Sequence, residues 1–309
     1  MTTKFDNKKE YKNIAEKLIK VLENDDIDVN NWNKGFIGFH NPTTNKEYTG
    51  KNIIILMLSQ MLSNYSDNRY LTFNQIKKLG LKLKKGSKGT CLNYVNTYRK
   101  DLKRNLTREE LNDGELLREL DRKGLLQSYK KYFTVFNGDD VEGLEEIKDI
   151  KVEITNDIDI NAIASNIGVL VKNQAINTAH YNLDDDCIYM PKLSQLTSSY
   201  EHYLKTFFHE LTHATGHKNR LDRNLANYGL DYDLHSTEEL IAELGSIILA
   251  KYFNVNVDEK LYNNSLIYIK GWLSFIEDDK KVEMMAAAIE QAIKAATLII
   301  SKSKIKKAA

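Results

Sequence analysis

The segment HELTH at residues 209–213 constrains the fold more strongly than any other part of the chain. On an α-helix, residues four apart lie on one face, so His209 and His213 can present two imidazoles to a single metal ion. Glu210 follows the first histidine, where its carboxylate can act as a general base toward a metal-activated water. The apolar LKTFF before the motif and Gly216 after it are typical of a buried helix with a defined end. These features favour a catalytic metal helix over two surface histidines on an ordinary helix.

A catalytic zinc site needs a third protein ligand and an open fourth position. The pattern H-E-x-x-H-x-x-G-x-x-H would place that ligand at residue 219, which is Asn219, so this arrangement is excluded. The later segment STEELIAELGS instead offers glutamates at helical spacing. We expect Glu239 to be the third ligand and Glu243 to be a carboxylate that orients a histidine, with Glu238 and Glu243 as alternative ligands. The expected metal is Zn²⁺, and another divalent cation is the alternative.

Length and cysteine content bound the organisation of the chain. The 309 residues, 42% of them hydrophobic, exceed what one small core needs and predict two domains, residues 1–145 and 146–309. Cys91 and Cys187 lack C-x-x-C spacing, which argues against a disulfide framework or a cysteine zinc site and fits a reducing compartment. The polar start MTTKFDNKKEYKN is unlike a signal peptide, and we see no apolar run long enough to cross a bilayer. We therefore expect a cytoplasmic protein with no membrane partner.

The net charge is only +1, but the charges are unevenly distributed. From Arg69 to Arg104 there are eleven Lys or Arg residues and one acid, whereas from Asp101 to Asp159 there are sixteen Asp or Glu residues. Aromatic residues interrupt the basic segment, a pattern typical of single-stranded nucleic-acid binding, in which cations neutralise phosphates and aromatic faces stack on bases. The alternative is a solvated basic face whose aromatic residues belong to the core. The candidate nucleic-acid-binding residues are Tyr70, Phe73, Lys84, Lys85, Lys88, Tyr94, Arg99 and Lys100.

Hydrophobic periodicity predicts a mixture of helices and strands, an α+β protein. In the front half we expect helices at 8–23 and 51–62, an exposed helix or a mobile insertion at 109–126, a short helix ending at Gly80, and strands at 91–100 and 129–140. In the back half we expect helices at 158–169, 237–252 and 282–300 besides the HELTH helix, and a hairpin at 178–191. The second strand of that hairpin, CIYMP, is a candidate edge strand that would pass the metal helix, and an ordinary strand within the sheet is the alternative.

Several blocks of sequence follow one another in a recognisable order. The front half contains TGKNIIILML, YLTFNQIKKLG, KKGSKGT and YFTVFNGDDVEGL, and the back half contains IYMP, HELTHATGHKNRLDR, EELIAELGS and YIKGWLSFIEDDK. In this order the blocks resemble the ArdC-type antirestriction proteins of conjugative elements, and the front half is also similar to TraC-type plasmid primases. The resemblance covers nearly the whole chain and departs at VNNWNKGFIGFHNP and between Asp101 and Gly124.

The resemblance implies an N-terminal α/β domain that binds single-stranded DNA and a C-terminal zincin-like metallopeptidase domain of the gluzincin type. It implies His209, His213 and a glutamate of EELIAE as metal ligands, with Glu210 as the catalytic base. The implied function is protection of mobile-element DNA from host restriction as it enters a new cell. The alternative is a metallopeptidase localised on DNA that cleaves a DNA-bound or restriction protein. A purely structural zinc module would not require Glu210. Duplex DNA is a further candidate partner.

Overall fold

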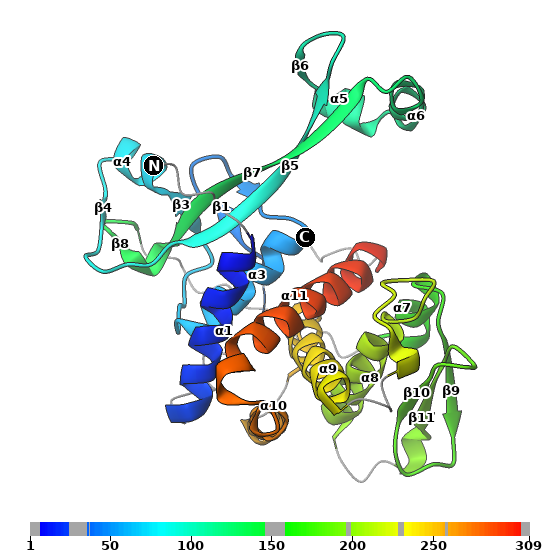
Figure 1. The fold of residues 1–309 in the computed structure, drawn as a ribbon. Helices are drawn as coiled ribbons and strands as arrows, with labels where there is room; N and C mark the ends of the chain where they lie inside the picture. The colour runs from blue at the N-terminus through cyan, green and yellow to red at the C-terminus, as the bar shows by residue number, and fades with distance from the viewer. Residues whose placement is uncertain are drawn as a thin grey trace.

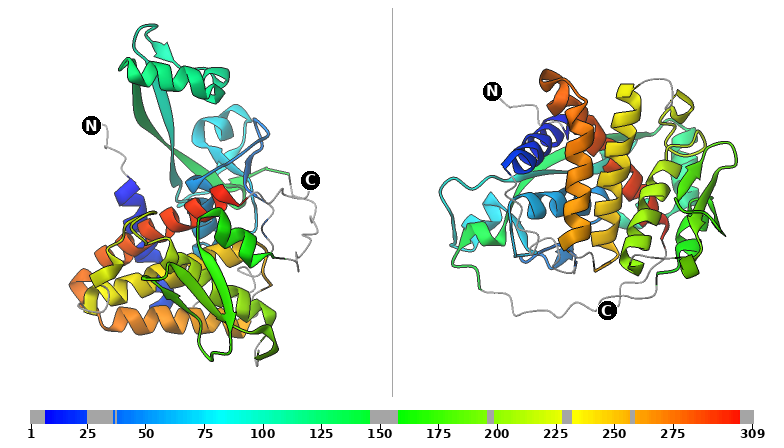
Figure 2. Two further views of the ribbon diagram at one scale, coloured as in Figure 1. Left: turned by 90° about the vertical axis from the view of Figure 1, so that its right-hand side faces the viewer. Right: turned by 90° about the horizontal axis from the view of Figure 1, so that it is seen from below.

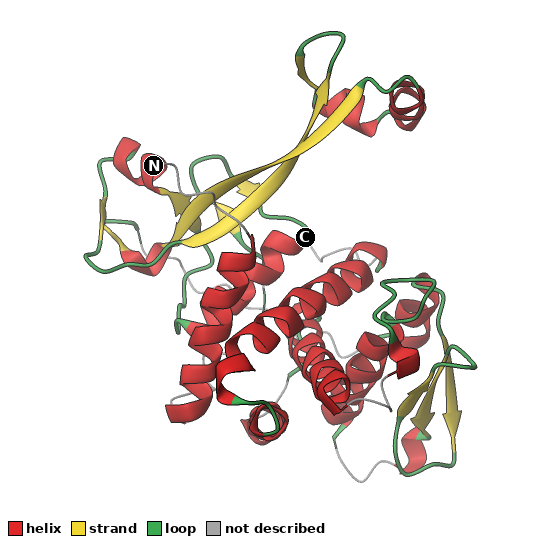
Figure 3. Ribbon diagram, in the orientation of Figure 1, coloured by secondary structure: helices red, strands yellow, loops and turns green. Residues whose placement is uncertain are grey.

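The computed structural model describes residues 7–24, 36, 38–145, 158–195, 199–227, 232–256 and 259–303. Figure 1 shows a helical body from which a long ribbon of two strands projects, with a small sheet on another side of the body. Helices dominate the body, and the longest strands lie in the ribbon (Figure 3). This mixture is the α+β architecture that the sequence predicts. The expected domain boundary after residue 145 falls at the edge of the described residues and stays a prediction.

The front half begins with two helices that match the predicted ranges, α1 (Asn7–Asn24) and α3 (Lys51–Leu62). α3 is apolar and buried on most sides because it packs against α1, the ribbon and the last helix, α11 (Asp278–Lys302). The short elements of this half are β1 (His40–Asn41), β2 (Lys46–Glu47), β3 (Tyr70–Thr72), α4 (Phe73–Lys78), β4 (Lys82–Leu83) and β8 (Val141–Glu142).

The ribbon consists of β5 (Thr90–Arg99) and β7 (Leu126–Asn137), which pair antiparallel along their length. The sheet has the order β3-β7-β5-β6, but β3 pairs with β7 only near the body, and β6 (Arg104–Asn105) pairs with β5 only at the far end. Between these points the ribbon is only two strands wide, so among the described residues no third strand pairs with either of its edges or covers either of its faces.

Two short helices close the far end of the ribbon, away from the body (Figure 2). They are α5 (Arg108–Asn112) and α6 (Gly114–Arg122), where the sequence predicts one exposed helix, or a mobile insertion, over 109–126. The difference arises at Asp113, whose carboxylate accepts hydrogen bonds from the backbone N–H groups of Glu115 and Leu116 and so begins a second helix.

The back half forms the remainder of the body and a three-stranded sheet. Its elements are α7 (Ile160–Asn166), β9 (Leu170–Gln174), β10 (His180–Asn182), β11 (Cys187–Pro191), α8 (Tyr200–Ala214), α9 (Tyr232–Tyr252) and α10 (Glu259–Ser274). The strand order is β10-β11-β9, with β11 antiparallel to β10 and parallel to β9. The expectation that CIYMP is an edge strand is therefore wrong, since β9, which the sequence did not predict, covers the other side of β11.

One hydrophobic core joins the two halves of the chain. A single cluster of buried residues runs from Tyr11 in α1 to Ile299 in α11, and α1 packs directly along α11 (Figure 1). A second, smaller cluster is formed by Leu71 of β3, Ile76 of α4 and Val141 of β8. The first and last helices of the chain therefore stabilise each other.

Among the described residues, α11 is the one helix long and apolar enough to cross a bilayer, although the sequence suggested no such run. Half of its most apolar window is buried within the protein, where it packs against α1, α3 and α9. A helix buried in the core of a globular protein can have the same length and apolar composition as a membrane-spanning helix. The packing of α11 is that of such a core helix.

Candidate metal centre and nucleic-acid surface

Helix α8 carries the HELTH motif and packs closely on α9. The Ser199 side chain caps α8 by accepting a hydrogen bond from the backbone N–H of His202. Where the helices approach each other, a Cβ atom added to Gly245 of α9 would lie 2.5 Å from Oγ1 of Thr212 in α8. Glycine is therefore required at this position, and the close approach brings the glutamates of α9 beside the histidines of α8.

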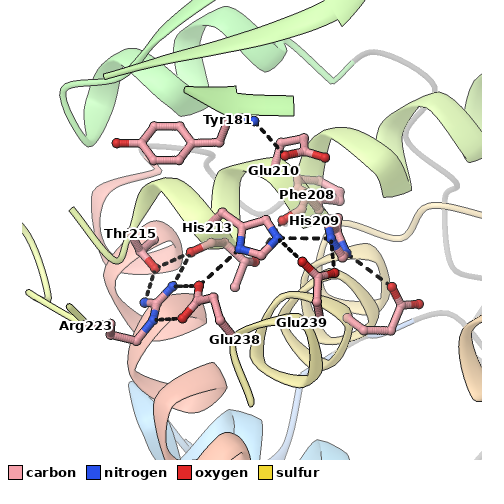
Figure 4. Close-up of polar contacts among 11 residues, drawn as sticks. Tyr181, Phe208, His209, Glu210, His213, Thr215, Arg223, Glu238 and Glu239 are labelled. Carbon is pink, nitrogen blue, oxygen red and sulfur yellow. Dashed lines mark hydrogen bonds and ion pairs between the residues drawn. The ribbon is translucent and has the colours of Figure 1, made fainter. Parts of the chain in front are cut away.

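Two imidazoles and one carboxylate converge between these helices (Figure 4). Nε2 of His209 lies 3.2 Å from Nε2 of His213, and carboxylate oxygens of Glu239 lie 3.5 Å from each of these nitrogen atoms. Within the described ranges this is the one group of potential metal ligands whose donor atoms all lie within 4.8 Å of one another. Ligands bound tetrahedrally to zinc at about 2.0–2.1 Å stand about 3.3–3.4 Å apart, so these three side chains could hold a divalent cation.

The other two glutamates of this region lie behind the histidines. Glu243 Oε2 is 3.2 Å from Nδ1 of His209, and Glu238 Oε1 is 3.1 Å from Nδ1 of His213. Both carboxylates therefore face the ring nitrogen that points away from Glu239. In this arrangement Nδ1 donates its proton to the carboxylate, and the lone pair of Nε2 is directed to the point of convergence.

Each of these carboxylates is itself paired with a buried cation. Lys205 Nζ lies 2.6 Å from Glu243 Oε1, and Arg223 donates from Nε and Nη2 to both oxygens of Glu238 at 2.9 and 2.6 Å. All four side chains are at most 10% exposed. These cations donate hydrogen bonds to carboxylate oxygens that would otherwise be buried without a partner.

The electrostatics of the centre favour a cation at His209. Burial opposes a charge on this imidazole, but Glu239 and Glu243 outweigh burial and raise the pKa of His209 to about 10. Burial would raise the pKa of Glu243, yet Lys205 and His209 lower it to about 2. Burial likewise opposes ionisation of Glu238, and Arg223 together with His213 lowers its pKa. Glu238 and Glu243 are therefore ionised at neutral pH, and their charge favours a proton or a metal ion at the histidines.

Glu210 lies between α8 and the edge strand of the small sheet. Its Oε2 accepts a hydrogen bond of 2.8 Å from the backbone N–H of Tyr181 in β10 (Figure 4). The Tyr181 hydroxyl donates to Asp186, and Arg220, from the loop after α8, also binds that carboxylate. The hairpin and the loop are thereby fixed around Glu210, which is 9% exposed.

A pocket of about 320 Å³ opens beside His209, on the side of α10. His209 and Glu239 line it together with Lys205, and Tyr268 and Trp272 of α10 form an aromatic part of its wall. Sequence patterns assign no role to these two aromatic residues, although they lie in the block YIKGWLSFIEDDK. The available signal was the spacing of the two aromatic residues, four apart on one helix. This spacing does not predict a pocket wall unless α10 is known to lie beside the metal helix.

The candidate nucleic-acid residues divide into accessible and inaccessible ones. Phe73 and Tyr94 are exposed, at 55% and 41%, and so are Lys84, Lys85, Lys88 and Lys100. Lys84 and Lys100 donate to the backbone carbonyls of Asp139 and Gly124 but remain on the surface.

Two of the candidates need correction. Tyr70 is fully buried, because β3 places it in the core, where its hydroxyl donates to the carbonyl of Leu56. It cannot stack on a base without local unfolding. Arg99 is 19% exposed and forms ion pairs with Asp101 and Glu110, so its guanidinium already has carboxylate partners.

The ribbon displays further aromatic and basic residues that were not among the candidates. Residues opposite each other in an antiparallel pair point to the same face, and Tyr94 is opposite Lys131, while Asn96 is opposite Tyr129. We call this surface the ribbon face; its members are Tyr94, Asn96, Tyr98, Tyr129 and Lys131. Tyr129 is 42% exposed. The run YKKY in β7 was the available signal, but its pairing with β5 could not be read from the sequence.

Comparison with known proteins agrees with this architecture. Residues 8–136 match the family described as the N-terminal domain of anti-restriction factor ArdC, and residues 159–289 match a zincin-like metallopeptidase family. The Mn(II)-bound crystal structure of the antirestriction ArdC protein from the R388 plasmid is similar, with a TM-score of 0.61 and 27% identity, over 98% of this chain and 100% of that one. Its metal-free structure has a TM-score of 0.59 and 26% identity, over 94% and 97%.

A DNA primase TraC of Escherichia coli is 32% identical over 258 residues. The match covers 80% of this chain and 17% of the primase, so the chain spans less than a fifth of that relative.

These findings define a two-domain protein in which an ArdC N-terminal domain is followed by a zincin-like metallopeptidase domain, a domain that implies a divalent metal. The chain belongs to the ArdC-type antirestriction proteins, as its sequence blocks predict.

Proposed function

We propose that the protein binds single-stranded DNA through its front half and protects incoming mobile-element DNA from host restriction in the cytoplasm. In this proposal the back half carries a zinc-dependent, metallopeptidase-like centre formed by His209, His213 and Glu239, with Glu210 as general base. Membership of the ArdC type supports the antirestriction role.

The observation that best supports DNA binding is the composition of the ribbon face. Tyr94 and Tyr129 are 41% and 42% exposed, and Lys131, opposite Tyr94, adds a cation beside them. The face lies on a projecting element, so an extended strand can reach it (Figure 1). Stacking of a base on an aromatic ring contributes about 1–3 kcal/mol per base and tolerates any sequence. The surface therefore suits single strands better than duplexes, whose bases are already stacked.

Fluorescence anisotropy of a labelled single-stranded oligonucleotide, titrated with the full chain at several salt concentrations, tests this proposal. We expect binding that weakens steeply as salt rises, because phosphate contacts release counterions. The variant Tyr94→Ala/Tyr129→Ala, which removes two stacking rings, should bind at least about thirtyfold more weakly. Tyr94→Phe/Tyr129→Phe keeps the rings and should bind like the natural protein. Equal affinity for the Ala and Phe variants would exclude the ribbon face, and an unlabelled duplex competitor tests whether duplex DNA also binds.

At the metal centre, the chain's own residues have separable roles. His209, His213 and Glu239 would hold the cation, Zn²⁺ in our proposal and another divalent ion as the alternative. When bound, such a cation supplies Lewis acidity toward a carbonyl oxygen and makes water more acidic. Glu238 and Glu243 hold the Nδ1 protons of the histidines, so that both Nε2 atoms keep a lone pair for the ligand role. Glu210 would accept a proton from water, and the Tyr181 N–H fixes its carboxylate for that task.

The second candidate function is hydrolysis of a DNA-bound or restriction protein. The pocket beside His209 favours it, since a structural metal site would need no adjacent cavity with aromatic walls. Glu210→Gln distinguishes the two functions, because it removes the base and keeps the shape. If the variant keeps metal and DNA affinity but no longer protects DNA in cells, hydrolysis is essential. If protection persists, the DNA-binding function does not depend on Glu210.

A further inference from the structure

A second pocket, of about 520 Å³, lies where the two halves of the chain meet. Its walls come from α1, the first residue of α3, the strand β7 and helix α11, which Figure 1 shows gathered at the base of the ribbon. Four lysines line it against a single carboxylate, that of Glu290. We call it the lysine pocket; its basic residues are Lys8, Lys51, Lys130 and Lys294.

Two lysines of this pocket are not directly paired with a carboxylate. Lys294 is 3.0 Å from Glu290. Within the described part of the chain, neither Lys51 nor Lys130 makes a hydrogen bond or an ion pair through its ammonium group. Burial lowers the pKa of Lys51, and the charges of Lys130 and Lys294 lower it further, against the opposing effect of Glu290. Like charges held near one another at a half-buried position create a positive potential that an anion would relieve.

Shape and lining indicate what kind of anion fits. A volume of this size is in the range that holds small organic ligands and exceeds what a bare inorganic ion needs. Tyr132, Ile293 and Leu298 supply apolar wall beside the lysines. A phosphate next to a sugar and a base matches such a combination of ammonium groups and apolar surface.

The register of the ribbon connects this pocket with the ribbon face. Tyr129, Lys130, Lys131 and Tyr132 are consecutive in β7, so their side chains alternate between the two faces. Tyr129 and Lys131 belong to the ribbon face, and Lys130 and Tyr132 line the pocket. Because the ribbon is two strands wide here, an extended polymer can pass around its edge from one surface to the other.

We propose that the lysine pocket binds a phosphate and its adjoining nucleoside from the same DNA strand that lies on the ribbon face. This proposal rests on the proposed function. It extends the DNA path from the ribbon to α11, in the half of the chain that carries the metal centre.

Anisotropy titrations with a labelled oligothymidylate and the full chain test the proposal. The test variant is Lys51→Gln/Lys130→Gln. The control is Lys20→Gln/Lys260→Gln, which removes the same charge from exposed lysines that line neither surface. We expect the test variant to bind about tenfold more weakly near physiological salt, with a salt slope shallower by about 0.7 for each phosphate that it no longer neutralises. The control should bind like the natural protein. The melting temperature of the test variant should stay the same or rise, since like charges have been removed.

The outcomes separate this proposal from the function on which it rests. If the natural protein binds no oligonucleotide, both fail. If it binds and the test variant matches the control in affinity and salt dependence, the pocket proposal is overturned and DNA binding stands. A calorimetric titration with thymidine monophosphate identifies the source of the phosphate. If the test variant loses only that binding and keeps oligonucleotide affinity, the pocket takes free nucleotides, and the proposal that a DNA strand occupies it is overturned.

Discussion

At the scale of single residues, the carboxylates behind the histidines decide whether the centre can hold a metal. Glu243→Ala should lower metal affinity about 10–100-fold, because His209 loses the partner that fixes its ring. It also leaves Lys205 buried without its carboxylate, which should destabilise the fold by about 3–5 kcal/mol. Metal titration monitored by calorimetry and urea unfolding measure the two effects. Glu201→Ala, on the first turn of α8, is the control, and a matching loss of affinity there would contradict the assigned role of Glu243.

The two cysteines give a second prediction at this scale. Cys91 and Cys187 are buried free thiols; burial raises the pKa of Cys91 to about 11 and raises that of Cys187. Since only the thiolate reacts, a higher pKa means less thiolate at a given pH and slower alkylation. In native protein at pH 8 we expect an alkylating reagent to modify neither thiol, and in denaturant to modify both. Rapid modification of either thiol in the native state would show that its environment opens readily.

At the scale of elements, the packing of α8 on α9 sets the geometry of the centre. Gly245→Ala introduces a methyl group 2.5 Å from Thr212 Oγ1, so the helices must separate and carry Glu239 away from the histidines. We expect weaker metal binding and a destabilisation of about 1–3 kcal/mol, as in other overpacked cores. The double variant Gly245→Ala/Thr212→Ala should recover part of both losses.

Gly271→Ala in α10 is the matched control for that substitution. An added Cβ meets nothing within 4 Å there, and alanine is the better helix former, so stability should rise by about 0.5–1 kcal/mol. Urea unfolding measures both changes. If Gly245→Ala were as harmless as Gly271→Ala, close packing of α8 on α9 would not be needed for the centre.

The elements also show which parts of the molecule can be read from sequence. The helix of the HELTH motif and the nearby glutamates are local patterns, α1 follows from helical periodicity, and α3 follows from a nearly continuous apolar run. The partners of Tyr70 and Arg99 are set by tertiary contacts, so a basic, aromatic-rich composition could not reveal that one is core and the other ion-paired. The ribbon face depends likewise on the register between β5 and β7, which joins residues about 35 apart in the chain.

At the scale of the whole molecule, the shared hydrophobic core predicts that the chain unfolds as one unit. Leu18 of α1 and Ile289 of α11 are 3% and 1% exposed in the same cluster, although they come from opposite ends of the sequence. Leu18→Ala and Ile289→Ala should each cost about 2–5 kcal/mol, and each should lower the same melting transition. Differential scanning calorimetry, with circular dichroism as a second probe, should show coincident transitions in both variants. Two resolved transitions, each shifted by only one of the substitutions, would mean that the front and back halves fold independently. If the halves do unfold together, DNA bound to the ribbon would raise the stability of the half that carries the metal centre, because a ligand of the native state stabilises the entire cooperative unit.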